Sequence, residues 1–220
     1  EWTTEECEEN FCEIQEGMPL TAGEKINSST TNPVTVSCKQ IEQQLGEFLT
    51  HPVKKCGLNL NVKRYKHLEV LGTLMDMTIH NKFPQKEGKT ALDLFDTYKG
   101  DGNIDELNTA KDTVVQVMTT YQTLVNAISE LQKGANRSEQ WESAVNVPHL
   151  LRSLYFVYKH HLYVSDVTDD IILKFRNMIV KTHLIRTPES KRLWNDIKFM
   201  AQNDSERIYD KYLEFYNETV

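Results

Sequence analysis

The sequence has 220 residues, 39% of them hydrophobic and 26% charged, with a formal net charge of −7. Such a length can bury one sizeable core or two packed halves, and no apolar run approaches the roughly 18 residues that cross a bilayer, which excludes a membrane-spanning helix. Seven glutamates among the first 16 residues account for the net charge. The rest of the chain is neutral by count and lacks the basic footprint of a nucleic-acid-binding protein.

Residues 1–36 are predicted to form an acidic, loop-rich N-terminal segment with too few large apolar side chains to fold alone. All four cysteines, Cys7, Cys12, Cys38 and Cys56, lie in the first quarter of the chain. An even, clustered set is typical of disulfides in an oxidising compartment, whereas zinc is the alternative and usually requires gaps of about two to four residues between paired cysteines. The preferred of three possible pairings joins Cys7 to Cys12 and Cys38 to Cys56.

Residues 37–220 are predicted to form a helical domain, as one unit or as two closely packed halves, with no strand-like alternation. Ser37 is expected to cap a first helix that Pro52 ends, and a second helix is expected over residues 61–82. Thr90, with Asp93 three residues on, resembles a capping box and predicts a short third helix.

The longest apolar stripe runs through residues 107–131, where apolar side chains recur every three or four positions. Its members are Leu107, Ala110, Val114, Val117, Tyr121, Leu124, Ile128 and Leu131, widened by Met118 and Val125. A stripe of this width is typical of a helix surrounded by other helices rather than of a two-stranded coiled coil. At about 1.5 Å per residue this helix extends roughly 37 Å, so the fold expected is an all-α, multi-helix bundle around a long central helix, with the N-terminal segment tethered by disulfides.

Three more helices are expected in the C-terminal part of the chain. An almost wholly apolar helix covers residues 148–163, with proline as its first residue. Ser165 is placed to cap the next helix, which extends to about residue 185. The last helix begins at Pro188 and contains a break at residues 203–205.

Four glycosylation acceptor motifs begin at Asn27, Asn136, Asn203 and Asn217. Each motif is short and weak alone, but together with the cysteines they favour a secreted, extracellular glycoprotein. The chain also begins without methionine, as expected of a mature secreted product.

Two segments of the chain are candidates for metal binding. The segment from Thr97 to Asn108 resembles a calcium-binding EF-hand loop, but Lys99 stands at its third position and an asparagine replaces the last, bidentate glutamate, so a polar turn is expected. His160 and His161 are adjacent, so on a helix their side chains point about 100° apart and cannot share a metal as residues four apart can. No metal or cofactor is expected.

Catalytic motifs are not found in the sequence. It has no glycine-rich phosphate loop, no serine elbow and no metalloprotease pair of histidines, and disulfide formation would leave no cysteine as a nucleophile. The prediction is therefore a protein without enzymatic activity, although an active site could still be assembled from scattered residues.

One concentration of basic residues could form an anion or partner patch. Its members are Lys54, Lys55, Lys63, Arg64 and Lys66, followed by His67. Such a patch suits a sulfated glycan, an anionic lipid or an acidic protein surface. The alternative interpretation is a solvated helix face.

The overall layout, an all-helical chain with early cysteines, scattered glycosylation motifs and no catalytic motif, resembles the orphan all-helical secreted proteins in the saliva of mosquitoes and other blood-feeding flies. The resemblance implies a non-enzymatic effector that binds a host haemostatic or immune component, or a protein of the feeding apparatus. The alternative is a carrier of a small apolar ligand, with Tyr155, Phe156, Tyr158 and Tyr163 lining an internal cavity instead of packing in the core. A protein binder needs instead an exposed patch with aromatic or arginine anchors.

Overall fold

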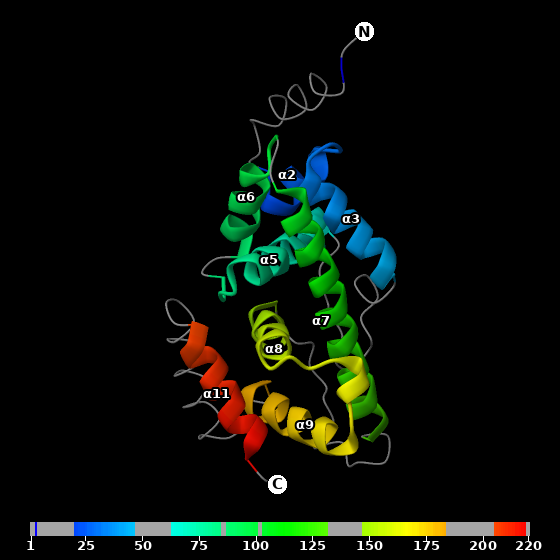
Figure 1. Ribbon diagram of the computed structural model, residues 1–220, viewed down its shortest axis with the longest axis vertical. Helices are drawn as coiled ribbons and strands as arrows, with labels where there is room; N and C mark the ends of the chain where they lie inside the picture. The colour runs from blue at the N-terminus through cyan, green and yellow to red at the C-terminus, as the bar shows by residue number, and fades with distance from the viewer. Residues whose placement is uncertain are drawn as a thin grey trace.

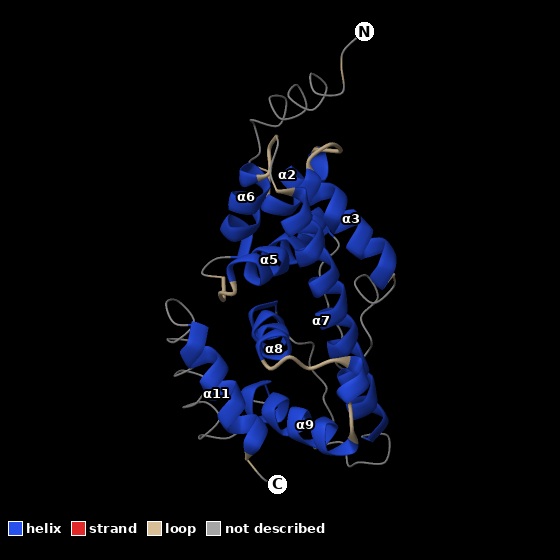
Figure 2. Cartoon of the chain, in the orientation of Figure 1, coloured by secondary structure: helices blue, strands red, loops and turns tan. Residues whose placement is uncertain are grey.

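The computed structural model of the chain describes Thr3 and residues 20–46, 63–84, 87–100, 103–131, 147–183 and 205–218. Every regular element within these ranges is helical, and they comprise eight α helices and two short 3-10 turns (Figure 2). The all-α prediction is therefore confirmed. Neither the longest helix nor any other in the described ranges is long and apolar enough to cross a membrane.

Helix α7 (Ile104–Leu131) extends along most of the molecule and is shared by two groups of helices (Figure 1). Its N-terminal half packs against α3 (Pro33–Leu45) and α5 (Lys66–His80), and its C-terminal half packs against α8 (Val147–Lys159) and α9 (Asp169–His183). Its buried residues are Leu107, Ala110, Val114, Val117, Met118, Thr120, Tyr121, Leu124, Val125 and Ile128. The predicted stripe is thus confirmed except at Leu131, which is 57% exposed.

The N-terminal group consists of α2 (Ala22–Ser28), α3, α5 and α6 (Glu87–Thr97). Helix α2 packs against α5 and α6 and buries Ile26 completely. It lies within the segment that was expected to be loop-rich, and its cause is local: the Thr21 hydroxyl accepts from the Glu24 amide while the Glu24 carboxylate accepts from the Thr21 amide, a complete capping box.

Three predicted helix starts differ from the structure. Asn32 caps α3 and Pro33 is its first residue, so Ser37 is a buried side chain inside the helix instead of its cap, and the expected boundary at residues 36 and 37 falls within α3. Thr90 lies inside α6. The Thr168 hydroxyl, rather than that of Ser165, accepts from the Ile171 amide at the start of α9.

The start of α5 approaches α2 very closely. The residues before it, Arg64 and Tyr65, have left-handed backbone conformations with φ of 61° and 55°. A Cβ atom placed on Gly23 would lie 2.2 Å from the carbonyl oxygen of Tyr65. Only glycine at this position lets the two backbones meet in this way.

Gly23→Ala is therefore expected to destabilise the protein, although alanine is the better helix former. The backbone carbonyl of Tyr65 must move to admit the methyl group, and overpacking of this kind costs about 1 to 3 kcal/mol. Gly88→Ala is the control, because its added methyl group would meet first the flexible end of the Glu69 side chain, at 3.1 Å. Urea unfolding measures both; an equal effect of the two variants would contradict the close approach at Gly23.

The C-terminal group consists of α8, α9 and α11 (Ser205–Asn217), with the 3-10 turn η5 (Val164–Asp166) joining α8 to α9. Helix α11 begins at the end of the predicted break at 203–205, whereas the first part of the expected last helix lies outside the described residues. Ring packing around Phe156 forms the centre of the group.

Polar and aromatic contacts also join the two groups directly. The Tyr158 hydroxyl donates to the Thr78 carbonyl at 3.2 Å, and the Phe83 amide donates to the Ser205 hydroxyl at 2.8 Å. The rings of Phe83 and Tyr155 meet edge to face with their centroids 5.6 Å apart. Helix α7 is therefore not the only connection between the groups.

Candidate binding surface

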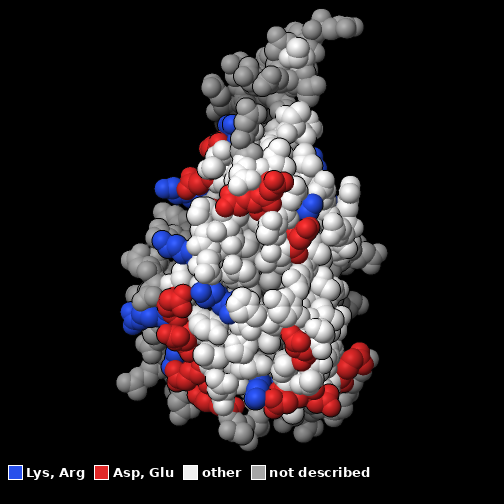
Figure 3. Space-filling model, in the orientation of Figure 1, with Lys and Arg blue, Asp and Glu red and all other residues white. Residues whose placement is uncertain are grey.

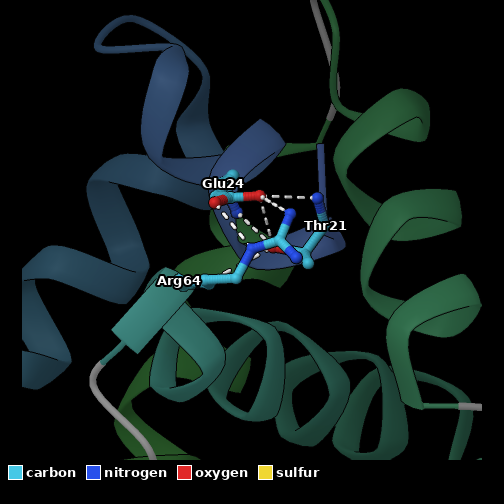
Figure 4. A network of polar contacts seen from close by, with 3 residues as sticks. All are labelled: Thr21, Glu24 and Arg64. Carbon is cyan, nitrogen blue, oxygen red and sulfur yellow. Dashed lines mark hydrogen bonds and ion pairs between the residues drawn. The ribbon is translucent and has the colours of Figure 1, made fainter. Parts of the chain in front are cut away.

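Two residues of the basic concentration predicted as an anion or partner patch, Arg64 and Lys66, form ion pairs with glutamates. Arg64 donates from Nε and Nη2 to the two carboxylate oxygens of Glu24, each at 2.9 Å, while Thr21 donates its amide hydrogen to Glu24 (Figure 4). The Arg64 guanidinium, followed by the Thr21 amide, lowers the pKa of Glu24 to about 2. The Thr21 hydroxyl lies 3.2 Å from the Arg64 carbonyl oxygen. These contacts hold Arg64, whose backbone is left-handed, in place against α2.

Among the other members of this patch, only the side chain of Lys66 is described. Lys66 forms an ion pair with Glu69 one turn along α5. Lys63 begins the 3-10 turn η2 (Lys63–Tyr65), and Lys54 and Lys55 lie outside the described residues. Arg64 therefore serves the contact of η2 with α2, while the ion pair of Lys66 lies within α5.

Cys38 corrects the expected disulfide arrangement. It is fully buried on α3 with a free thiol, whose Sγ lies 3.8 Å from the Leu68 carbonyl oxygen on α5. The structure therefore lacks the expected bond from Cys38 to Cys56, because Cys38 faces the core between two helices. Cys7, Cys12 and Cys56 lie outside the described residues.

The Cys38 thiol should resist alkylation in the folded protein, because burial, together with the nearby Glu42 carboxylate, raises its pKa above the ordinary value. Iodoacetamide labelling without reduction, followed by peptide mass analysis, is expected to modify Cys38 only after urea is added. Rapid labelling of the native protein would contradict its burial. Failure to label it in urea would show that it is bonded after all.

Two histidines are built into helix contacts. His67 is 2% exposed, and its Nε2 lies 3.3 Å from the Glu42 carboxylate on α3. His160 stacks on Phe156 with a centroid distance of 5.0 Å, and its Nδ1 lies 3.0 Å from the Tyr209 hydroxyl. The adjacent His161 is exposed at the end of α8. Each of the two buried or half-buried rings has a packing role.

Acidification should destabilise the fold through these histidines. Burial lowers the pKa of His67, against the opposing effect of Glu42, and burial followed by the charge of His161 lowers the pKa of His160. Below the ordinary pKa of 6.5 the unfolded chain then binds more protons than the folded one, so stability falls as the pH falls from 6.5 towards the lowered values. Urea midpoints between pH 7.5 and about 5 measure this effect, and a His67→Gln variant with an unchanged pH slope would contradict it for His67.

Two of the aromatic residues considered as a cavity lining, Tyr155 and Phe156, pack on rings of other helices and loops. Tyr155 and Phe156 are 0% exposed, and the rings of Tyr155 and Tyr158 lie 6.5 Å apart. Tyr163 is 40% exposed. The side chains of Tyr155, Phe156 and Tyr158 therefore pack in or against the core, whereas that of Tyr163 is exposed.

The remaining predicted sites are only partly described. Asn217 is exposed at the end of α11 and Asn27 is half-buried on α2, whereas Asn136 and Asn203 lie outside the described residues. Of the segment from Thr97 to Asn108, Thr97 ends α6 and the residues from Ile104 onward belong to α7, whereas residues 101 and 102 lie outside the described residues. Across the described ranges, no group of three His, Cys, Asp or Glu side chains is placed to hold a metal ion.

The outer side of α7 is unusual because it carries no charge over most of its length. Residues 113–129 contain no Asp, Glu, Lys or Arg, where the average content of about 25% would give roughly four. We call the exposed and half-buried polar and alanine positions of residues 113–127 the neutral α7 face: Thr113, Gln116, Thr119, Gln122, Thr123, Asn126 and Ala127. An exposed helix face is ordinarily charged, so this composition is informative.

The hydroxyl groups of the neutral α7 face are satisfied within the helix itself. Thr113, Thr119 and Thr123 each donate to the carbonyl four residues earlier, at 2.8, 2.7 and 2.9 Å. Covering these side chains therefore leaves their donors paired, which avoids the usual cost of burying an unsatisfied hydroxyl.

The turn η5 packs against α7 and adds exposed apolar groups. Tyr163, directly before the turn, is 40% exposed, and Val164 is 45% exposed. Figure 3 shows an uncharged area on this side of the molecule, along the course of α7 in Figure 1. The neutral α7 face with Tyr163 and Val164 is thus the candidate binding surface.

Sequence reasoning did not find this surface, although part of its signal was present. The charge-free run at 113–129 is visible in the sequence and the apolar stripe indicates its inner side, but only the structure shows that η5 lies against the helix. No family model matches the chain, and comparisons with curated proteins and with solved structures find no significant match.

Proposed function

We propose that this protein is a secreted, non-enzymatic binding protein that docks a protein partner on the neutral α7 face. The observation that carries the proposal is the absence of charge from the exposed and half-buried positions of residues 113–129 on the longest helix. Charged residues are depleted at the centres of protein interfaces, where aromatic residues are enriched. Tyr163 supplies an exposed aromatic anchor beside this centre.

The partner class follows the resemblance in layout to salivary proteins of blood-feeding flies: a host haemostatic or immune component, or a protein of the feeding apparatus. Secretion is supported by the glycosylation motifs, of which Asn217 is accessible at the end of α11. A non-enzymatic role is supported by Glu24, His67 and His160, because an ion pair or helix packing explains the altered pKa of each.

A carrier of a small apolar ligand is the alternative, and the aromatic packing gives it no support. Phe156, one of its candidate lining residues, is surrounded by other rings. Native mass spectrometry of the natural protein discriminates the two functions, since a carrier is expected to retain a lipid-sized mass.

The test of the proposed function uses vertebrate plasma. Immobilised protein is expected to retain a plasma component and, when added free, to change clotting time or complement lysis. The double variant Gln116→Arg/Asn126→Arg places two charges on the neutral α7 face and should lose both effects. Gln43→Arg/Gln44→Arg, which adds the same charges to exposed positions of α3, is the matched control. Equal behaviour of the two variants would refute a role of the neutral α7 face.

A further inference from the structure

The polar contacts described between the two groups of helices gather in one seam. In Figure 1 the end of α5 faces the start of α11 on the left of the molecule, whereas α7 runs along the right. Two hydrogen bonds of the seam, those of Tyr158 and of the Phe83 amide, are given above. In addition, Lys159 donates from Nζ to the Asn81 side chain at 3.3 Å and forms an ion pair with Glu206 at 3.1 Å. The Lys159 side chain is only 18% exposed, so this one lysine joins α8 to α11 and to the residue that ends α5.

The centre of this seam is aromatic and covered. Phe83 is 8% exposed and Tyr155 is 0% exposed, and their rings meet edge to face across the seam. We call this ring pair, together with the polar contacts of Tyr158, Lys159 and the Phe83 amide, the latch. Every contact of the latch involves at least one side chain, so the two groups can separate here while each helix stays intact.

Helix α7 joins the two groups through a segment of β-branched residues. Lys111 contacts the first group, because it donates to the Gln40 side chain on α3 at 3.1 Å. Tyr121 contacts the second, since its ring lies edge to face with Phe175 on α9, with 6.1 Å between centroids. Of the nine residues 112–120 between these contacts, six are valine or threonine: Thr113, Val114, Val115, Val117, Thr119 and Thr120. Such side chains lose rotamer freedom in a helix, so the passage between the groups has a low helix propensity.

Side-chain hydroxyl groups also make this passage easier to bend. Those of Thr113, Thr119 and Thr120 each donate to the carbonyl four residues earlier, and such bonds often bend a helix. Because residues 113–129 carry no charge, this segment lacks the ion pairs between residues four apart that support exposed helices. Helix α7 alone therefore does little to fix the angle between the two groups.

We propose that residues 112–120 of α7 are a hinge about which the two groups rotate, and that the latch keeps them closed. Rotation about a few residues that absorb the backbone change is a common form of domain motion. Opening parts the rings of Phe83 and Tyr155 and presents them at the surface, while each group keeps its own core. The inference goes beyond the proposed function and stands without it. Since the hinge underlies part of the neutral α7 face, opening also changes the shape of that surface.

The Phe83 amide reports the opening, because its hydrogen bond to Ser205 crosses the latch. Hydrogen exchange of single amides is followed by NMR on the full-length protein at low concentrations of urea. The Phe83 amide is expected to exchange faster than those of the buried Leu71 in α5 and Leu154 in α8. Its exchange should depend little on urea, because opening at a hinge exposes far less surface than unfolding does.

Tyr158→Phe/Lys159→Met removes the polar latch contacts of both side chains and keeps the ring and the aliphatic stem. It should accelerate exchange of the Phe83 amide about five- to fiftyfold, the size expected for the loss of two or three hydrogen bonds. Tyr163→Phe/Lys174→Met is the matched control, because it removes the same groups from an exposed tyrosine and from a lysine that pairs within α9. The control should leave Phe83 exchange unchanged.

Alanine in the hinge should have the opposite effect. Thr113→Ala/Thr119→Ala removes two β-branched side chains and their bonds to carbonyls, so α7 resists bending and exchange of the Phe83 amide should slow about two- to fivefold. Thr109→Ala/Thr123→Ala makes the same change on the same helix outside residues 112–120, and should leave Phe83 exchange unchanged. Fraying of the turn after α5 alone would respond to neither variant.

Three results would overturn the inference. The first is exchange of the Phe83 amide at the rate of Leu71 and Leu154, with the same dependence on urea, which would show that the groups separate only on global unfolding. The second is equal Phe83 exchange in Tyr158→Phe/Lys159→Met and its control. The third is equal exchange in the two pairs of threonine variants, which would place the motion in the turn after α5 instead of in α7.

Discussion

Phe156→Ala is expected to lower the free energy of unfolding by about 3 to 5 kcal/mol, the usual cost of removing a buried aromatic ring. Phe156 is 0% exposed. Its ring centroid lies between 5.0 and 6.5 Å from five other rings, so the truncation removes contacts with α9, with α11 and with the turn that follows α8 together. The five rings belong to His160, Phe175, Tyr209, Tyr212 and Tyr216.

Urea unfolding followed by circular dichroism measures this loss. Tyr163→Ala is the control, because it also removes an aromatic ring but one that is 40% exposed, and it should change stability much less. If the two variants lose equal stability, Phe156 does not occupy the centre of the C-terminal group. Phe156→Leu, which keeps most of the apolar volume, should fall between the two and remain folded.

Leu124→Ala is expected to cost about 2 to 5 kcal/mol, through lost transfer energy and the cavity that remains. Leu124 is 0% exposed on α7, the helix that both groups share. The loss should therefore lower the melting temperature in a single transition rather than unfold one group alone. The expected cost of Leu124→Ala is a large part of the roughly 5 to 15 kcal/mol by which a folded domain is typically more stable than its unfolded chain.

The control for Leu124→Ala is Asn126→Ala, two residues along the same helix at an exposed position. Alanine is the better helix former, so this variant should be neutral or slightly stabilising. Thr123 is a weaker control, because it is half-buried and its hydroxyl donates to the Thr119 carbonyl. If Leu124→Ala left the melting temperature unchanged, the apolar stripe of α7 would not be covered by other helices on both flanks.

The elements predicted best from the sequence are those with long apolar periodicity. The stripe from Leu107 to Ile128 recurs every three or four residues over many turns, and such a pattern can be satisfied only by burial on one helix face. Helix α2 was missed because it is short and needs only one large buried side chain, Ile26, beside a glycine. Its capping box at Thr21 and Glu24 was the available local signal.

Features that depend on residues distant in the sequence could not be predicted. The ion pair of Glu24 with Arg64 joins two helices only after they pack, and spacing alone does not pair them. The same holds for Cys38: an even number of cysteines favours disulfides, but its orientation into the core between α3 and α5 is a tertiary property. The uncharged run on α7 was likewise visible, but the packing of η5 against this helix is a tertiary contact.

The position of α7 makes the proposed binding surface conditional on the integrity of the whole domain. The segment that carries the neutral α7 face is rich in threonine and valine, which are poor helix formers, and isolated helices are marginal in water without tertiary support. Its inner side is held by α3 and α5 at one end and by α8 and α9 at the other. Proteolysis or truncation in either group would therefore abolish recognition although every contact residue remained in the chain, so that only an intact molecule would engage its partner.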